Sequence, residues 1–267
     1  MNLSAVGASI GYTVFVWWFS TGAILWLDRR PQRFHRAGFA LVSAVAAVSV
    51  IGLGLSLDDA SPRGAVLGFT AALGLWGWHE ASFLMGFVTG PSLAPCPAGA
   101  SGWRRFRLAA ATLIYHEIAL AVTLAALAVF SAGHGNPVGL CTFGVLFMAR
   151  LSAKLNLFLG VPNFSMEFFP DRLRYLTSYL RKSSGNALFP LSMVAGAAVI
   201  WIEGRGLSAA SARPYVVVSQ SLLLALTALA VLEHLFMVLP VPDSTLWRWA
   251  LPASPDNGRD PRALDKR

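Results

Sequence analysis

Three of the five histidines in this sequence stand next to a glutamate, and each pair lies inside a long apolar run. The pairs are His79–Glu80, His116–Glu117 and Glu233–His234. An ionisable side chain in such a run costs about 2.5–3.5 kcal/mol on membrane insertion and is a candidate for function. Imidazole and carboxylate are ligands that zinc, iron and manganese accept. The first hypothesis is therefore a metal site formed by His79, Glu80, His116, Glu117, Glu233 and His234.

A further apolar run carries Arg150, Lys154 and Asn156 in the string ARLSAKLN. With these residues a second hypothesis is a tetrapyrrole site, in which a histidine is the axial ligand and Arg150 or Lys154 faces the pigment carboxylates. A third is a buried network that holds helices together, in which the glutamates neutralise Arg150, Lys154 and the histidines. The residue types leave all three open.

Helix geometry limits the metal hypothesis. Adjacent residues on a helix project about 100° apart, so a His-Glu pair does not easily give both side chains to one ion. One residue would bind the metal and the other would orient it. The sequence also lacks the Glu-x-x-His spacing of di-iron bundles and the His-Glu-x-x-His spacing of zinc peptidases.

The elements that must position these residues are membrane helices. Of the 267 residues 55% are hydrophobic and only 13% are charged, and the charges crowd between long apolar runs. A helix needs about 20 apolar residues to cross the hydrocarbon core, where each backbone amide must bond within its own segment. We therefore predict an all-α, polytopic membrane bundle in a single domain, 1–267. About seven spans are expected, at 8–27, 37–57, 64–88, 107–131, 137–159, 187–203 and 214–239.

Charge sets the predicted orientation. Alternate connections hold eighteen of the lysines and arginines, with Arg150 and Lys154 included, whereas the other set holds Arg63, Arg205 and Arg213. Basic residues accumulate on the cytoplasmic side, so we predict a bacterial inner-membrane protein with a periplasmic amino terminus and a cytoplasmic carboxyl terminus. The same asymmetry explains the net charge of +8 without nucleic acid, because the basic side faces the anionic leaflet.

This topology predicts that the polar residues share one layer. At 1.5 Å per residue, His79, His116 and Arg150 lie about 14 Å from the cytoplasmic ends of their spans. Glu233, His234 and Lys154 lie about 8 Å from theirs by the same measure. All fall in the cytoplasmic half, so we expect them to line a common interior pocket.

Two segments outside the spans also carry a prediction. Pro170 to Lys182 begins with proline and places Leu173, Leu176 and Leu180 at i, i+3 and i+7, which predicts a short amphipathic helix. It lies either at the membrane interface or as a solvated loop helix packed on the bundle, and the sequence leaves both open. The charged tail 252–267 is predicted to be disordered.

Several strings resemble the photosynthetic complex assembly protein 2 family, the PuhE-type proteins of anoxygenic phototrophic bacteria. They run in order from about Tyr12 to Leu251: FVWWFSTGAILWLD, WGWHEASFLMGFVTGP, SGWRRFR, IYHE, ARLSAKLNLFLGVPN, EFFPDRLRYLTSYLRK, NALFPLS and LEHLFMVLPVPDSTLWRWAL. The resemblance implies a protein of the photosynthetic membrane that helps assemble the reaction-centre and core-antenna complex and is linked to bacteriochlorophyll supply. Its expected partners are reaction-centre and light-harvesting subunits or other assembly factors.

The resemblance supplies no catalytic residues, so a non-enzymatic assembly factor is the leading hypothesis. The alternative is an integral membrane metalloenzyme or tetrapyrrole-binding protein that uses the intramembrane His/Glu cluster, with a transition metal or bacteriochlorophyll as its cofactor. A transporter is disfavoured, because no inverted repeat or pair of interrupted helices is visible.

Overall fold

The structure, a computed structural model, describes residues 3–209, 213–240 and 243–251. Within these residues it is helical, with no β-strand and one isolated bridge between Val161 and Lys182. The α-helices are α1 (Leu3–Asp28), α2 (His35–Ser56), α3 (Pro62–Leu84), α4 (Gly102–Ala111), α5 (Ile114–Ser131), α6 (Val138–Leu159), α7 (Leu188–Ala209) and α8 (Pro214–Phe236). Short 3-10 helices are η1 (Gln32–Phe34), η2 (Met166–Phe168), η3 (Asp171–Tyr179) and η4 (Asp243–Trp247). The predicted all-α membrane bundle is confirmed.

In the described part of the chain, six helices are long and apolar enough to cross a membrane: α1, α2, α5, α6, α7 and α8. The seventh long helix, α3, is not among them, since it carries His79 and Glu80. It packs against α1, α2, α5, α6 and α8. A helix covered on so many sides needs less apolar surface toward lipid, which accounts for its lower hydrophobicity.

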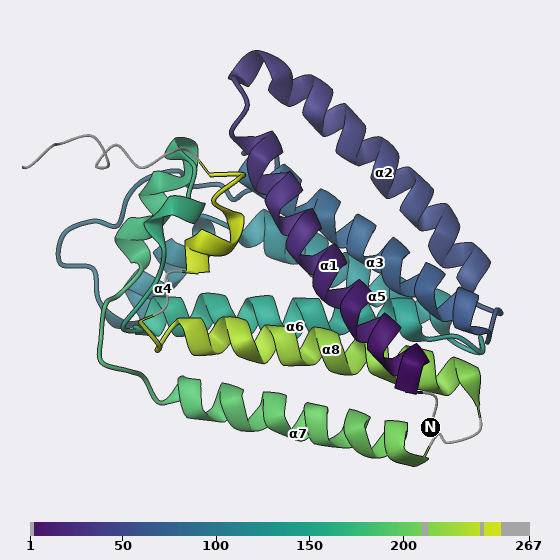
Figure 1. Cartoon of the computed structure of the whole chain (residues 1–267). Coiled ribbons are helices and arrows are strands. Elements are labelled where there is room, and N and C mark those ends of the chain that lie inside the picture. Colours follow the sequence, from purple (N-terminus) through teal and green to yellow (C-terminus); the bar gives the residue numbers. More distant parts are fainter. Residues whose placement is uncertain (1–2, 210–212, 241–242, 252–267) are drawn as a thin grey trace, which may run out of the picture.

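The long helices run side by side, with α3 and α8 in the interior and α2 and α7 on the outside (Figure 1). The central contact between α3, α6 and α8 is made by Phe69, Val138, Leu222 and Leu226, each at most 2% exposed. One end of the bundle collects α4, η3 and η4 with most of the arginines, and we call it the basic end. The opposite end holds the α2–α3 turn and the α5–α6 turn, where Asn136 donates to the carbonyls of Ser56 and Asp59.

The predicted span 107–131 is wrong as one continuous helix. It is broken between α4 and α5 at Thr112 and Leu113. The preceding loop supplies the hydrogen bonds lost there: the Thr89 carbonyl accepts from His116 N at 3.0 Å, and Ser92 N donates to the Ala111 carbonyl at 3.1 Å. Gly90 allows this approach, because a Cβ there would stand 2.3 Å from the Ala111 oxygen.

The segment predicted as an amphipathic α-helix is the 3-10 helix η3. It buries Leu173, Leu176 and Tyr179, whereas Leu180 is only partly buried. A 3-10 helix has three residues per turn, so its apolar face repeats every third residue and not at i+7. A short amphipathic helix is therefore present, with a different period and with its apolar face packed on the bundle.

The carboxyl-terminal segment docks on α1. The Trp18 indole donates to the Leu246 carbonyl at 2.8 Å, and the Trp247 indole donates back to the Trp18 carbonyl at 2.9 Å. Trp247 is 5% exposed and packs against Leu25. The predicted disordered tail, 252–267, lies outside the described residues.

Candidate functional site

Helix α6 separates the predicted polar layer into two groups. Arg150 and Lys154 are four residues apart and share one face, and Ser152 and Asn156 share another in the same way. An offset of two residues turns a helix by about 200°, so the two faces point in nearly opposite directions. The first faces α3 and α5, and the second faces α7 and α8.

On the first face lies an ion-pair cluster, formed by Glu80, His116, Glu117, Arg150 and Lys154. The Lys154 ammonium donates to the Glu117 carboxylate, and Arg150 Nη2 lies 3.2 Å from Glu80 Oε2. The side chains of Glu80, Glu117 and Lys154 are 12–16% exposed, whereas Arg150 is 43% exposed. Two acids therefore face two bases, and the formal charges cancel.

His116 completes the cluster in an unusual state. Its side chain is fully buried, its ring lies 4.6 Å from the Phe83 ring, and neither ring nitrogen has a hydrogen-bond partner. The His116 Nε2 atom is 4.0 Å from Glu80 Oε1, which is also without a hydrogen bond. The two groups thus face each other just beyond hydrogen-bonding distance.

His79 points elsewhere, although it is adjacent to Glu80 in the chain. Its Nε2 atom lies 3.0 Å from the Thr123 hydroxyl of α5, and its ring contacts Trp78 and Phe143. His79 is 3% exposed, so these contacts enclose it. Adjacent residues on a helix project about 100° apart, and this angle separates His79 from the ion-pair cluster that Glu80 joins.

The second face of α6 meets His234 in a network of uncharged partners, the His234 network. His234 Nδ1 lies 2.8 Å from the Ala230 carbonyl and its Nε2 lies 2.9 Å from the Ser152 hydroxyl. The Ser152 hydroxyl is 2.9 Å from that of Ser192 on α7, which also accepts from Asn156 at 3.0 Å. These bonds join α6, α7 and α8.

Glu233 faces away from both groups. Its carboxylate accepts a 2.7 Å hydrogen bond from the Trp17 indole of α1, at an exposed position. The acid beside His234 therefore joins α8 to α1.

The structure does not bring the nine predicted residues into one pocket: five share the ion-pair cluster, Asn156 and His234 share the His234 network, and His79 and Glu233 make separate contacts. The three histidines lie apart from one another, on α3, α5 and α8, and within the described ranges no three His, Cys, Asp or Glu side chains are arranged to hold a metal ion. Arg150 and Lys154, predicted to face pigment carboxylates, are bonded to the protein's own carboxylates. The geometry is that of the third hypothesis, a buried network between helices.

Two polar contacts were not anticipated from the sequence. Glu203 on α7 receives a 3.3 Å hydrogen bond from Thr227 on α8, and its other carboxylate oxygen is buried without a partner. The predicted span ended at residue 203, but α7 continues to Ala209, which places this acid inside the helix. At the basic end, Arg172 of η3 lies 3.1 Å from Asp28, which is 1% exposed. Only the docking of η3 on α1 brings that pair together.

Comparison with known proteins places these features in a family. The model of a family described as "Protein of unknown function (DUF3623)" matches residues 3–258. The chain is 45% identical, over 251 residues, to a protein of Rhodobacter capsulatus described as "Uncharacterized 30.4 kDa protein in puhA 5'region"; the match covers 91% of this chain and 90% of that protein. No solved structure matches the chain. Because the family model covers almost every helix and docking segment described above, the chain belongs to the DUF3623 family.

Proposed function

We propose that this chain is a membrane assembly factor for the reaction-centre and core-antenna complex of a photosynthetic membrane. The observation that carries the proposal is the relative's position in the puhA 5' region, which fits a photosynthesis gene cluster. Similarity over 91% of the chain supports extending that context to the whole bundle. The PuhE-type strings found in the sequence point to the same setting.

The exposed cations of the basic end are the surface that we propose for partner binding. Arg174 is 72% exposed, and several further basic side chains of this end are exposed as well: Arg104, Arg107, Arg181, Lys182 and Arg248. They lie on α4, η3 and the segments that follow η3 and η4. We propose that this end faces the cytoplasm, where it meets newly made subunits and the anionic leaflet.

A deletion strain tests the assembly role. Cells that lack the chain should contain less reaction centre and core antenna while they still synthesise bacteriochlorophyll, as measured by near-infrared absorption and immunoblotting of membranes. Unchanged amounts of both complexes in the deletion strain would overturn the proposal.

Charge variants then test the proposed surface. Arg104→Gln, Arg107→Gln and Arg181→Gln together remove three exposed cations from the basic end. The matched control removes Arg63, Arg205 and Arg213, which are exposed at the opposite end. We expect the first variant to restore less complex than the control at equal protein abundance; equal restoration would exclude the basic end as the binding surface.

No contact in the site favours the metalloenzyme alternative over a structural network. Separate alanine substitutions of His79, His116 and His234 distinguish the two. A network predicts that complex levels fall in proportion to the abundance of each variant protein. Loss of function at undiminished abundance for one histidine would support catalysis.

A further inference from the structure

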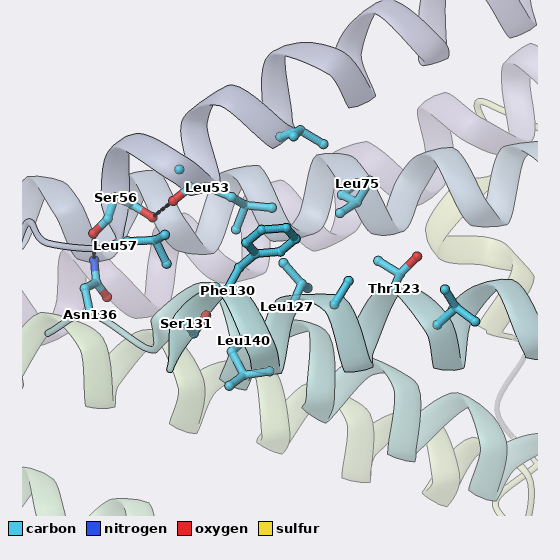
Figure 2. Close-up of a pocket in the computed structure, with 15 residues that line it drawn as sticks. Leu53, Ser56, Leu57, Leu75, Thr123, Leu127, Phe130, Ser131, Asn136 and Leu140 are labelled. Carbon is cyan, nitrogen blue, oxygen red and sulfur yellow. Dashed lines mark hydrogen bonds between the residues drawn. The ribbon is translucent and has the colours of Figure 1, made fainter. Parts of the chain in front are cut away.

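A cavity of about 410 Å³ lies between α2 and α5, in the half of the bundle away from the basic end. Figure 2 shows its walls: Leu53 comes from α2 and Leu57 directly follows that helix, Leu127 and Phe130 come from α5, and Leu75 of α3 forms the back. The start of α6 closes the cavity near the membrane surface, at Gly139 and Leu140. None of the predicted site residues lines it.

Four polar side chains line the wall, those of Ser56, Thr123, Ser131 and Asn136, and three of them bond to other groups of the protein. The Ser56 hydroxyl donates to the Leu53 carbonyl at 2.8 Å, and the Thr123 hydroxyl is bonded to His79. Asn136 donates to backbone carbonyls of the α2–α3 turn. A bound water needs two to four polar partners, and a wall this apolar does not supply them, so its occupant must be apolar.

The rim of the cavity faces the hydrocarbon region of the bilayer. Val50 of α2 and Val122 and Phe130 of α5 line it and are 57%, 61% and 68% exposed. In a membrane bundle, large apolar side chains exposed to this degree contact acyl chains. In the view of Figure 2 the Phe130 ring points from α5 toward Leu53.

The position of the opening favours one kind of apolar occupant. Val50, Val122 and Phe130 line the rim and lie among acyl chains, so a flexible hydrocarbon chain stands at the opening in any bilayer. A transmembrane helix of a partner protein would first have to displace that chain.

We propose that this cavity binds one acyl chain of a bilayer phospholipid, with the headgroup at the end near Ser131 and Asn136. That end coincides with the last turn of α5 and the α5–α6 turn, where the chain leaves the membrane. The site is independent of the proposed assembly role, since it rests on the cavity alone. It makes a phospholipid a bound component of the bundle.

Photolabelling in vesicles tests the proposal. The full chain is reconstituted into phosphatidylcholine vesicles that contain a phosphatidylcholine with a diazirine in its acyl chain, irradiated, and mapped by peptide mass spectrometry. Leu75 should be labelled, because α3 is covered by α2 and α5 and only a chain inside the cavity reaches that residue. Phe143, which is 0% exposed, gives the background level.

Filling the cavity provides the matched comparison. Gly54 lines it, and a Cβ there meets no atom within 4 Å, so Gly54→Leu projects into the open space. Gly11 on α1 is equally open and lies away from the cavity, so Gly11→Leu is the control. We expect Gly54→Leu to reduce labelling of Leu75 to that of Phe143, and Gly11→Leu to leave it unchanged.

Val122 serves as an internal reference for folding, because its outward face should be labelled by bulk lipid in every variant. Ala126→Leu fills the cavity from the α5 wall and should repeat the result of Gly54→Leu. The proposal is overturned if Leu75 is at background in the unsubstituted protein. It is equally overturned if both filled variants keep full labelling of Leu75.

Discussion

Glu80, Glu117, Arg150 and Lys154 show how this protein carries charges inside its spans. Each of the four costs free energy on leaving water, and the cost is offset only when an opposite charge lies within bonding distance. The structure provides that partner for each of them, and the pairs join α3, α5 and α6. The charges therefore stabilise the contacts among these three helices. The sequence indicated that glutamates would neutralise Arg150 and Lys154, but not which acid pairs with which base.

A double-mutant cycle on Lys154 and Glu117 tests this role. Lys154→Met leaves a buried carboxylate unpaired and should lower the free energy of unfolding by about 3 kcal/mol. Adding Glu117→Leu removes the unpaired charge and should recover most of that loss. Unfolding is followed by circular dichroism in a denaturant titration of the protein in mild detergent.

Arg174→Met is the control for this cycle, because Arg174 and Asp171 form an ion pair whose side chains are 72% and 92% exposed. It should leave unfolding unchanged. If the double variant is no more stable than Lys154→Met, the two residues do not act as a pair.

Glu203 should behave differently from Glu80. It forms no ion pair in the described part of the chain, and glutamine retains an oxygen that accepts the hydrogen bond from Thr227. Glu203→Gln should therefore change the free energy of unfolding by no more than about 0.5 kcal/mol. Glu80→Gln weakens the bond to Arg150 and should cost more, about 1–3 kcal/mol, in the same titration. A larger effect at Glu203 would indicate a partner outside the described residues.

At the scale of elements, short segments at the basic end hold the ends of the long helices together. Arg105 of α4 is one example, since its guanidinium donates to the carbonyls of Phe158 on α6 and Tyr179 on η3. The carboxyl-terminal segment is another, because η4 and the residues after it pack on α1 through Trp247 and Trp249. These contacts shape the surface that we propose for partner binding.

Gly22 allows the carboxyl-terminal segment to dock. A Cβ at this position would stand 2.1 Å from the Trp249 ring, so Gly22→Val should displace the segment from α1. We expect trypsin to cleave several-fold faster after Arg248, as measured by the time course of the truncated product. The bundle itself should unfold at the same denaturant concentration.

Gly11→Val is the matched control, because a Cβ at Gly11 meets no atom within 4 Å. Its cleavage rate should equal that of the unsubstituted protein. If Gly22→Val also leaves the rate unchanged, Trp249 does not hold the segment on α1.

At the scale of the whole molecule, the two ends differ in charge. The segments that hold most of the arginines gather at the basic end, and the α2–α3 turn at the opposite end carries Asp58 and Asp59. This polarity supports the predicted orientation with the basic end in the cytoplasm.

Cysteine labelling tests that orientation. Single cysteines are placed by Asp58→Cys and by Ala98→Cys, both at exposed positions, in a chain whose Cys96 and Cys141 are replaced by serine. An impermeant maleimide should label the Asp58→Cys variant in intact spheroplasts, and the Ala98→Cys variant only after the membrane is opened. The reverse pattern would contradict a cytoplasmic basic end.

The sequence predicted where the long helices lie, because an apolar run of sufficient length has few alternatives in a bilayer. Most of their ends agree within a few residues, but α1 begins earlier and α7 ends later than predicted. The break at Thr112 escaped prediction, since the hydrogen bonds that stabilise it come from Thr89 and Ser92, in the loop before α4. The three-residue spacing of the buried side chains of η3 was also missed. Leu173, Leu176 and Tyr179 are buried by residues far away in the chain, which the local sequence does not identify.

The sequence by itself therefore determined the apolar helices and the separation of charge between alternate connections, because both depend on local composition. Only the tertiary structure decided the partners of the polar residues. A step of one residue turns a helix by about 100°, so His79 and Glu80, adjacent in the chain, reach different helices. Similar depth in a membrane places side chains in one layer, whereas the rotation of each helix and the identity of its neighbours decide which of them meet.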